Sequence, residues 1–242
     1  MIFQNLLSQK FKLSNSLTLL EMQTIEVNNF IEIKRLFKLQ LDPILDQPDL
    51  YKFEYEEDLN ERRLRDAESL GVIARNIDCK RILEIGTSDG KGTVLLAANA
   101  PAAEIYTINI PLEEIERGEG GSHITHGLTE EQIGKFYKER QLKNIHQIFA
   151  NTANWVPDLN DIDLAFIDGC HDKEFVINDT VKIMKVMRPG GFIIWHDFNP
   201  KLISNYKWIR EVSEGINELY KMKVLKNRIY QVKDSWCGIY RV

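Results

Sequence analysis

The stretch EIGTSDGKG, residues Glu84 to Gly92, links two segments with different patterns. The apolar run RILEIG, residues 81–86, predicts a strand, and GTVLLAANA, residues 92–100, predicts a helix. The glycines of the linking stretch allow positive φ angles and close approach of another backbone, and the helix N-terminus offers unpaired N–H groups to a polar ligand. The sequence therefore predicts a cofactor-binding turn, against the plainer alternative of a tight turn that needs glycine.

The alternation of strand and helix continues on both sides of this turn. Upstream, apolar residues recur every three to five positions over residues 59–74, which predicts a helix with one buried face. Further helices are predicted after a capping box formed by Thr129 and Gln132, and over residues 176–187. Strands are predicted at AEIYTINI (103–110), IHQIFA (145–150), IDLAFID (162–168) and FIIWHD (192–197). Such alternation predicts a doubly wound α/β fold whose sheet is mostly parallel and covered on both faces.

The two ends of the chain differ from this pattern. After a helix around residues 205–220, the segments KVLKNRIYQVK (223–233) and SWCGIYRV (235–242) predict two strands that pair antiparallel, because their link is too short for a parallel crossover. Residues 1–56, interrupted by Pro43 and Pro48, are predicted to form a helical appendage, and residues 57–242 the main domain. A homodimer formed through this appendage is an option that the sequence leaves open.

Composition limits the range of functions. The chain has 242 residues, 43% of them hydrophobic, which suits one large domain. Its net charge of −5 gives no overall attraction to phosphate backbones or anionic lipid, so neither nucleic acid nor a membrane is expected as a partner. We find no apolar run long enough for a membrane span and no signal-peptide pattern. Three widely spaced cysteines, Cys79, Cys170 and Cys237, predict thiols in a reducing compartment, so the cytoplasm is the expected location.

Two classes of cofactor suit the glycine turn. The spacing of Gly86, Gly90 and Gly92 resembles the nucleotide turn of NAD-dependent short-chain dehydrogenases, which also need a Tyr-x-x-x-Lys pair. None of the eight tyrosines has a lysine four positions later. The acidic Glu84, two residues before the first glycine, instead resembles the first motif of class I S-adenosylmethionine-dependent methyltransferases.

This second resemblance covers residues 59–242. IDLAFIDGCH (162–171), the predicted turn RPGG (188–191), FIIWHDF (192–198) and YTINIP (106–111) resemble motifs of the small-molecule O-methyltransferase-like branch of that superfamily. The resemblance implies a seven-stranded sheet with S-adenosylmethionine across the carboxyl ends of the first, second and fourth core strands, at the topological switch point. It also implies transfer of the sulfonium methyl group to a small-molecule acceptor, most simply a hydroxyl. An NAD-dependent reductase and a binding module without catalysis stay open as alternatives.

The resemblance also implies a set of cofactor-binding residues. Glu84 would complement the positive amino group of the methionine moiety. Asn109 stands where an acid commonly accepts hydrogen bonds from the ribose hydroxyls, and Asn151 stands where an aspartate often binds the adenine amine. The expected set is Glu84, Gly86, Thr87, Ser88, Gly90, Thr93, Asn109, Asn151, Thr152 and Asp168.

Two routes could activate the acceptor. His171, three residues after Asp168, matches the position of a base that removes the hydroxyl proton, and His196 ends a strand on the same edge. Alternatively, Asp168 and Asp197 align with two ligands of metal-dependent relatives and could hold Mg²⁺. The usual third ligand is replaced by Phe198, and Asn199 follows one residue late, so we favour the histidine.

Three other features have plainer interpretations. Residues 111–127 form a glycine-bearing loop that could act as a lid, and its His123 and His126 could touch a substrate or metal, although solvation is the simpler prediction. Strand alternation turns Trp195 away from His196, towards core packing. Cys170 is not expected to be a nucleophile.

Overall fold

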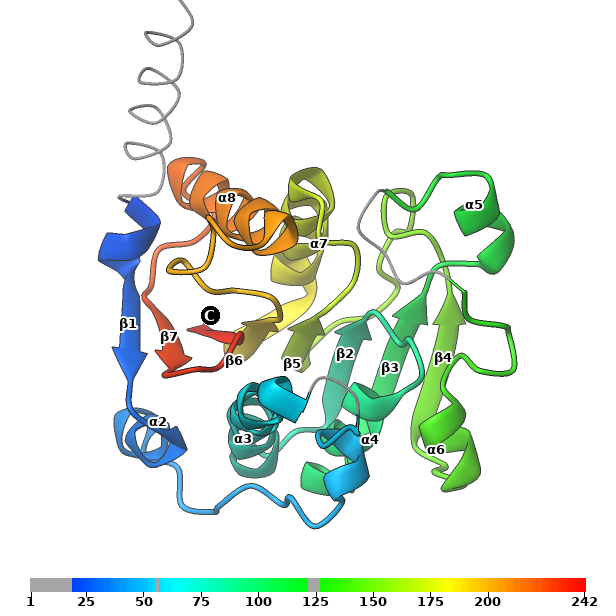
Figure 1. Ribbon diagram of the computed structural model, residues 1–242, viewed down its shortest axis with the longest axis horizontal. Helices are drawn as coiled ribbons and strands as arrows, with labels where there is room; N and C mark the ends of the chain where they lie inside the picture. Colours follow the sequence, from blue (N-terminus) through cyan, green and yellow to red (C-terminus); the bar gives the residue numbers. More distant parts are fainter. Residues whose placement is uncertain (1–18, 55–56, 122–126) are drawn as a thin grey trace, which may run out of the picture.

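The computed structural model describes residues 19–54, 57–121 and 127–242. Within them, eight strands form one sheet in the order β1-β7-β8-β6-β5-β2-β3-β4 (Figure 1). The strands are β1 (Thr24–Val27), β2 (Arg81–Ile85), β3 (Glu104–Asn109), β4 (Ile145–Phe149), β5 (Ile162–Ile167), β6 (Met187–Trp195), β7 (Ile229–Val232) and β8 (Gly238–Arg241). The order reverses between β2 and β5, which therefore form the switch point where α/β proteins bind ligands.

Helices cover both faces of the sheet. α3 and α4 pack together on one face, and α7 and α8 on the other (Figure 1). The helices are α2 (Phe30–Phe37), α3 (Asn60–Asn76), α4 (Lys91–Asn99), α5 (Leu112–Glu116), α6 (Lys135–Glu139), α7 (Lys173–Val186) and α8 (Lys207–Lys221), with short 3₁₀ helices at Pro48–Leu50 and Glu57–Leu59. None of the helices in the described ranges is long and apolar enough to cross a membrane.

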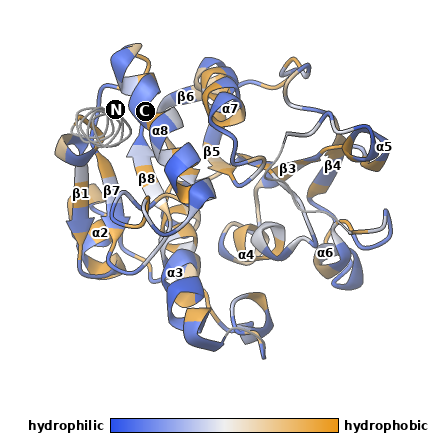
Figure 2. Ribbon diagram, turned by 45° about the horizontal axis from the view of Figure 1, so that its top comes forward, coloured by the Kyte–Doolittle hydropathy of each residue, from blue (hydrophilic) through white to orange (hydrophobic). Residues whose placement is uncertain are grey.

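The two faces of the sheet bury two separate hydrophobic cores. Every residue of β5 is buried, as expected for a central parallel strand covered on both sides. Along β5 and β6, alternate residues enter opposite cores: Leu164 and Ile194 face α3 and α4, while Ala165 and Ile193 face α7 and α8. Figure 2 shows hydrophobic residues along β3 and β5, whereas α5 is hydrophilic. The predicted doubly wound fold is confirmed.

The edge of the sheet formed by β1, β7 and β8 confirms one prediction and adds a strand that was not predicted. β7 and β8 pair antiparallel, with Ile229 opposite Tyr240, as predicted. The sheet has one strand more than the expected seven, because Thr24–Val27 pairs parallel with β7. The N-terminal segment therefore contributes an edge strand as well as helix α2, whose Ile33 is fully buried.

Two local predictions need correction. The RPGG segment, expected to be a turn, belongs to β6, which starts at Met187 and pairs with β5 across an irregular register between Ile162 and Leu164. The side chain of Gln132 accepts the N–H of Thr129 at 2.8 Å, as in half of a capping box, but the α-helix begins only at Lys135.

Candidate active site

The turn between β2 and α4 has a backbone that requires glycine. Gly86 has a φ of +103°, and a Cβ atom there would lie 2.0 Å from the carbonyl oxygen of Asp168. Gly90 caps α4 with a φ of +91°. Ser88, between them, also has a left-handed φ of 49°. The turn is therefore pressed against the segment that follows β5, and a side chain at residue 86 would push the two apart.

A pocket opens beside this turn, at the carboxyl ends of β2, β3, β4 and β5. Gly86, Ser88 and Asp168 lie at its β2–β5 side, and Asn109 lies at the end of β3. Apolar side chains from β2, β3, α5 and α7 complete the wall, including Ile85, Ile108, Leu112, Ile115 and Phe175. Of the ten residues expected to bind the cofactor, this first pocket brings together Gly86, Ser88, Asn109, Asn151, Thr152 and Asp168.

The other four expected residues lie beneath or behind the turn. The carboxylate of Glu84 is buried and accepts hydrogen bonds from the hydroxyls of Thr93, at 2.5 Å, and Thr107, at 2.6 Å. The hydroxyl of Thr87 lies 2.7 Å from that of Thr107, and Gly90 packs against Gly134. Burial raises the pKa of Glu84 to about 8, although both hydroxyls favour its charged form. In the structure Glu84 therefore supports the turn from below.

Asn109 also acts on the turn. Its Oδ1 accepts the N–H of Ser88 at 3.1 Å, and its Nδ2 donates to the carbonyl of Ile110 at 2.9 Å. Asn151, after β4, accepts a hydrogen bond from the N–H of Ala153 with its Oδ1 and donates one to the backbone carbonyl of Glu119 with its Nδ2. Both amides therefore hold the backbone around the first pocket, in addition to lining it.

A cluster of histidines and aspartates lies where β5 and β6 end. His171 Nε2 is 3.1 Å from Asp197 Oδ2 and 3.7 Å from Asp168 Oδ1. His196 Nδ1 is 3.1 Å from Asp168 Oδ1 and 3.4 Å from Asp197 Oδ2. On its other side, His196 Nε2 is 3.4 Å from Asp66 Oδ2. Both expected catalytic histidines thus share the two expected metal-binding aspartates.

The cluster balances its charges internally. Burial disfavours the charged form of each histidine, but the carboxylates of Asp168 and Asp197 outweigh it and raise the pKa of both His171 and His196. His196 and His171 in turn hold the pKa of Asp168 below its usual range against the effect of burial. Asp66 has its pKa lowered in the same way, by His196 and Arg62. The histidines and the carboxylates of this cluster therefore stabilise each other's charged forms.

The third partner of Asp168 and Asp197 is a histidine. Donor atoms of Asp168, His171 and Asp197 lie within 4.8 Å of one another. Phe198 is fully buried, and the side chain of Asn199 bonds to the backbone of Lys201 and Ser235. Mg²⁺ prefers oxygen ligands, whereas an imidazole nitrogen suits transition metals. This set of possible metal ligands, two carboxylates and an imidazole, therefore fits Mg²⁺ poorly.

A second pocket lies on the other side of Asp168. Asp168 and His196 line it together with side chains from residues 50–53, from α3 and α4, and with Cys237, which precedes β8. Apolar side chains, among them Leu50, Phe53, Leu70, Leu95 and Phe166, form much of the wall. Its polar residues were not predicted from the sequence to belong to a site; they are Arg62, Arg63, Asp66, Lys91 and Cys237. A signal was present, because Arg63, Asp66 and Glu68 are charged residues on the buried side of α3.

The remaining candidates are placed as follows. His123 and His126 lie outside the described residues. Part of the expected lid, with Leu112, Ile115 and Gly120, lines the first pocket. Trp195 is fully buried and donates a hydrogen bond to the hydroxyl of Thr180 at 2.9 Å, in agreement with a packing role. Cys170 is buried and lines the first pocket.

Comparison with known proteins decides between the two cofactor classes. Residues 83–198 match Methyltransf_24, a family model described as a methyltransferase domain. Residues 83–198 therefore form a class I S-adenosylmethionine-dependent methyltransferase domain. The matched region runs from β2 to just beyond β6, and it includes the glycine turn, Asp168, both histidines and Asp197.

Individual relatives are distant. The uncharacterized protein R132 of Acanthamoeba polyphaga mimivirus is 27% identical over 143 residues, which cover 57% of this chain and 58% of the relative. The methyltransferase PaMTH1 of Podospora anserina, solved with S-adenosylhomocysteine, is 17% identical with a TM-score of 0.55, covering 86% of this chain and 92% of that one. The O-methyltransferase TomG of Streptomyces achromogenes is 16% identical with a TM-score of 0.53, covering 87% and 94%. At these identities the solved structures support the fold alone.

Proposed function

We propose that the protein transfers the methyl group of S-adenosylmethionine to a hydroxyl of a small-molecule acceptor. The observation that carries this proposal is the position of Asp168, which lines both pockets. A donor in the first pocket and an acceptor in the second would meet at this residue. Holding nucleophile, methyl group and leaving sulfur in line is the main contribution that a protein makes to such a displacement.

The first pocket suits S-adenosylmethionine, which supplies an electrophilic methyl group when bound. The turn at Gly86 lets a ligand approach the backbone, and Ser88 and Asn109 offer polar groups at the end of β3, where we place the ribose. Asn151 and Thr152 then stand near the base, and Asp168 near the amino-acid end. Glu84, Thr87, Gly90 and Thr93 contribute indirectly in this proposal, by fixing the shape of the turn.

We assign the base to His171. The side chain of His171 is 25% exposed, so a proton that it takes up can reach solvent. Its Nε2 lies within 4 Å of both Asp168 and Asp197, whose charges stabilise the imidazolium that forms. His196 is a weaker candidate, because Nδ1 faces these two aspartates while Nε2 faces Asp66. In this proposal Asp168 orients the acceptor hydroxyl and His171 receives its proton.

A product assay tests the acceptor, and a measurement of S-adenosylhomocysteine and NADH binding tests the cofactor. The purified protein is incubated with S-adenosylmethionine and a panel of hydroxyl, amine and thiol compounds, and methylated products are identified by mass spectrometry. Products confined to hydroxyl compounds are expected. Methylation of amines alone would refute a hydroxyl acceptor but would still support methyl transfer from S-adenosylmethionine. Binding of S-adenosylhomocysteine without any product across the panel would favour a binding module, and binding of NADH instead would favour a reductase.

A further inference from the structure

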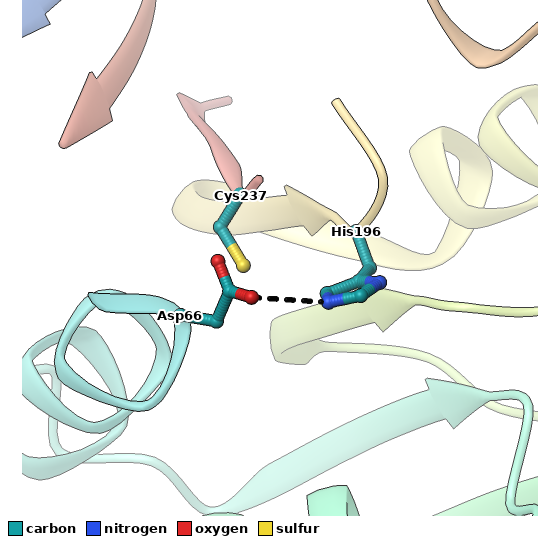
Figure 3. A group of neighbouring side chains, drawn as sticks. All are labelled: Asp66, His196 and Cys237. Atoms are coloured by element: carbon teal, nitrogen blue, oxygen red, sulfur yellow. Dashed lines mark ion pairs between the residues drawn. The ribbon is translucent and has the colours of Figure 1, made fainter. Parts of the chain in front are cut away.

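A second group of side chains that can bind a metal ion faces the second pocket. Asp66 projects from α3, His196 follows β6, and Cys237 precedes β8; Figure 3 shows the three side chains pointing towards one another. One donor atom from each lies within 4.8 Å of the other two. We propose that Asp66, His196 and Cys237 bind a thiophilic divalent transition-metal ion such as Zn²⁺.

The spacing of the donor atoms suits a tetrahedral ion. His196 Nε2 and Asp66 Oδ2 are 3.4 Å apart. Zinc bonds of about 2.0–2.1 Å to nitrogen and oxygen, at a tetrahedral angle, place these two atoms about 3.3 Å apart. The same geometry places a thiolate sulfur, bonded at about 2.3 Å, roughly 3.5 Å from the nitrogen. Cys237 Sγ lies within 4.8 Å of both atoms, so the thiolate has to come closer by a rotation of its side chain.

Each ligand is held by a neighbouring group. Asp66 Oδ1 accepts hydrogen bonds from the hydroxyl of Ser235, at 2.8 Å, and the N–H of Trp236, at 2.7 Å, which leaves Oδ2 for a cation. The N–H of Cys237 donates to the same Ser235 hydroxyl at 2.9 Å. The other nitrogen of His196 faces the carboxylates of Asp168 and Asp197. A carboxylate behind a ligating histidine is the usual second layer of a metal site, since it fixes the tautomer.

The donor types and the surroundings select the class of metal. A set of one carboxylate, one imidazole and one thiolate suits Zn²⁺ and similar transition metals, whereas Mg²⁺ and Ca²⁺ prefer oxygen alone. All three residues line the second pocket, which supplies an entry path and room for water as a fourth ligand. Without a metal, burial and the nearby Asp66 raise the pKa of the Cys237 thiol, so the ion must displace the thiol proton when it binds.

Arg62 shows that a cation is already accommodated at this position. Its Nη1 lies 2.6 Å from Asp66 Oδ2 and 3.4 Å from His196 Nε2, and its guanidinium lies over the ring of Trp236. A carboxylate oxygen can accept this hydrogen bond and bind a metal ion at the same time, because it has two lone pairs. Metal binding therefore requires Arg62 to withdraw from His196 but not from Asp66.

The test is calorimetric titration of the chelator-treated full chain with Zn²⁺, without donor or acceptor. One ion per chain is expected. Loss of a ligand should cost at least the upper end of the 10- to 100-fold range known for supporting residues, so Cys237→Ser and His196→Gln should each weaken binding by about 100-fold or more. Cys79→Ser should bind like the unaltered protein, and His171→Gln should lose less than about tenfold. Binding lost in His171→Gln but kept in Cys237→Ser would move the ion to Asp168 and Asp197 and overturn the proposal, as would no binding at all.

Spectroscopy with Co²⁺ identifies the sulfur ligand directly. The unaltered protein should show a thiolate-to-cobalt charge-transfer band together with the visible absorption of a tetrahedral site, and Cys237→Ser and Cys237→Ala should lose the charge-transfer band. Its persistence in both variants would refute the assignment. Circular dichroism melting checks that each variant folds, and His196→Gln carries the test if the cysteine variants do not. Because no methyl donor is present, this result does not depend on the proposed methyl transfer.

Discussion

The two pockets that meet at Asp168 are built in different ways. The first is shaped largely by backbone, at a glycine turn and at the ends of consecutive strands β2, β3, β4 and β5. The second is shaped by side chains that come from distant parts of the sequence, from Arg62 on α3 to Cys237 before β8. A pocket shaped by backbone leaves a local pattern of glycines and strand ends in the sequence, whereas a pocket shaped by distant side chains leaves no such local pattern. In the proposed function, many sequences can therefore share the donor pocket, whereas single residues can change what the acceptor pocket binds.

If the first pocket depends on backbone shape, a side chain at Gly86 should have the largest effect on the binding of S-adenosylhomocysteine. S-adenosylhomocysteine at 100 times its dissociation constant should stabilise the unaltered protein by about 2.7 kcal/mol, and NADH should not. Gly86→Val should abolish that stabilisation, because its Cβ would lie 2.0 Å from the Asp168 carbonyl oxygen in a φ region that branched residues avoid. Thermal melting with each ligand measures both results.

Gly118→Ala is the matched control. Gly118 also has a positive φ, +73°, but a Cβ there meets nothing within 4 Å. This variant should therefore bind S-adenosylhomocysteine normally. A melting shift with NADH alone would refute the donor assignment, and normal donor binding by Gly86→Val would show that the turn does not contact the donor.

The same contrast explains how much could be read from the sequence. The core fold was predictable because strand and helix periodicities are local, and Gly86 was predictable because its need for glycine is local too. The edge strand Thr24–Val27 was missed, since it has four residues and pairs with β7 about 200 positions later. The metal-binding group of Asp66, His196 and Cys237 depends on the same kind of distant contact. The motif around Glu84 gave no sign that this side chain would be buried beneath α4.

The next prediction concerns His171, which lies beside Asp168 and Asp197. His171→Ala should lower kcat by about 10²- to 10⁴-fold and leave S-adenosylhomocysteine binding intact, because it removes the base but not the donor site. The base must be neutral to accept a proton, and Asp168 and Asp197 raise the pKa of His171. In the unaltered protein kcat/KM should therefore rise with pH through a pKa above 6.5, higher than an isolated histidine would give.

Asp197→Asn separates this explanation from a structural role of His171. Removing the charge of Asp197, 3.1 Å from His171, should shift the rising limb of the pH profile to lower pH. A lower rate with an unmoved profile would point to structural damage. Activity that survives both His171→Ala and a chelator would exclude the base and a metal, and would leave alignment of the substrates as the explanation.

A third prediction concerns the support beneath the first pocket. The folded-state pKa of Glu84 is about 8, above the value of about 4.3 expected in the unfolded chain, so the folded state holds an extra proton between these values. Its contribution to stability is complete below the unfolded pKa and is lost as pH rises towards 8. Glu84→Gln needs no proton and should remove this dependence. The free energy of unfolding of the unaltered protein, relative to the variant, should fall by up to about 1.4 kcal/mol per pH unit in this window. Urea titrations from pH 5 to 8 measure the slope, and parallel curves would show that Glu84 is ionised.

The smallest effect is expected at Asn109, where backbone support and ligand contact combine. Asn109→Ala leaves the Ser88 N–H without its side-chain acceptor and should weaken donor binding by about fivefold, equivalent to about 1 kcal/mol. Asn109→Asp keeps that acceptor and adds a charge to which ribose hydroxyls can donate, so donor affinity should be unchanged or higher. Isothermal titration with S-adenosylhomocysteine measures both, with the exposed Asn205→Ala as control. If alanine weakens binding and aspartate does not, the side chain acts through its oxygen, as the contact with Ser88 requires. If both variants bind like the unaltered protein, Asn109 has no part in the donor site, and the first pocket depends on backbone alone.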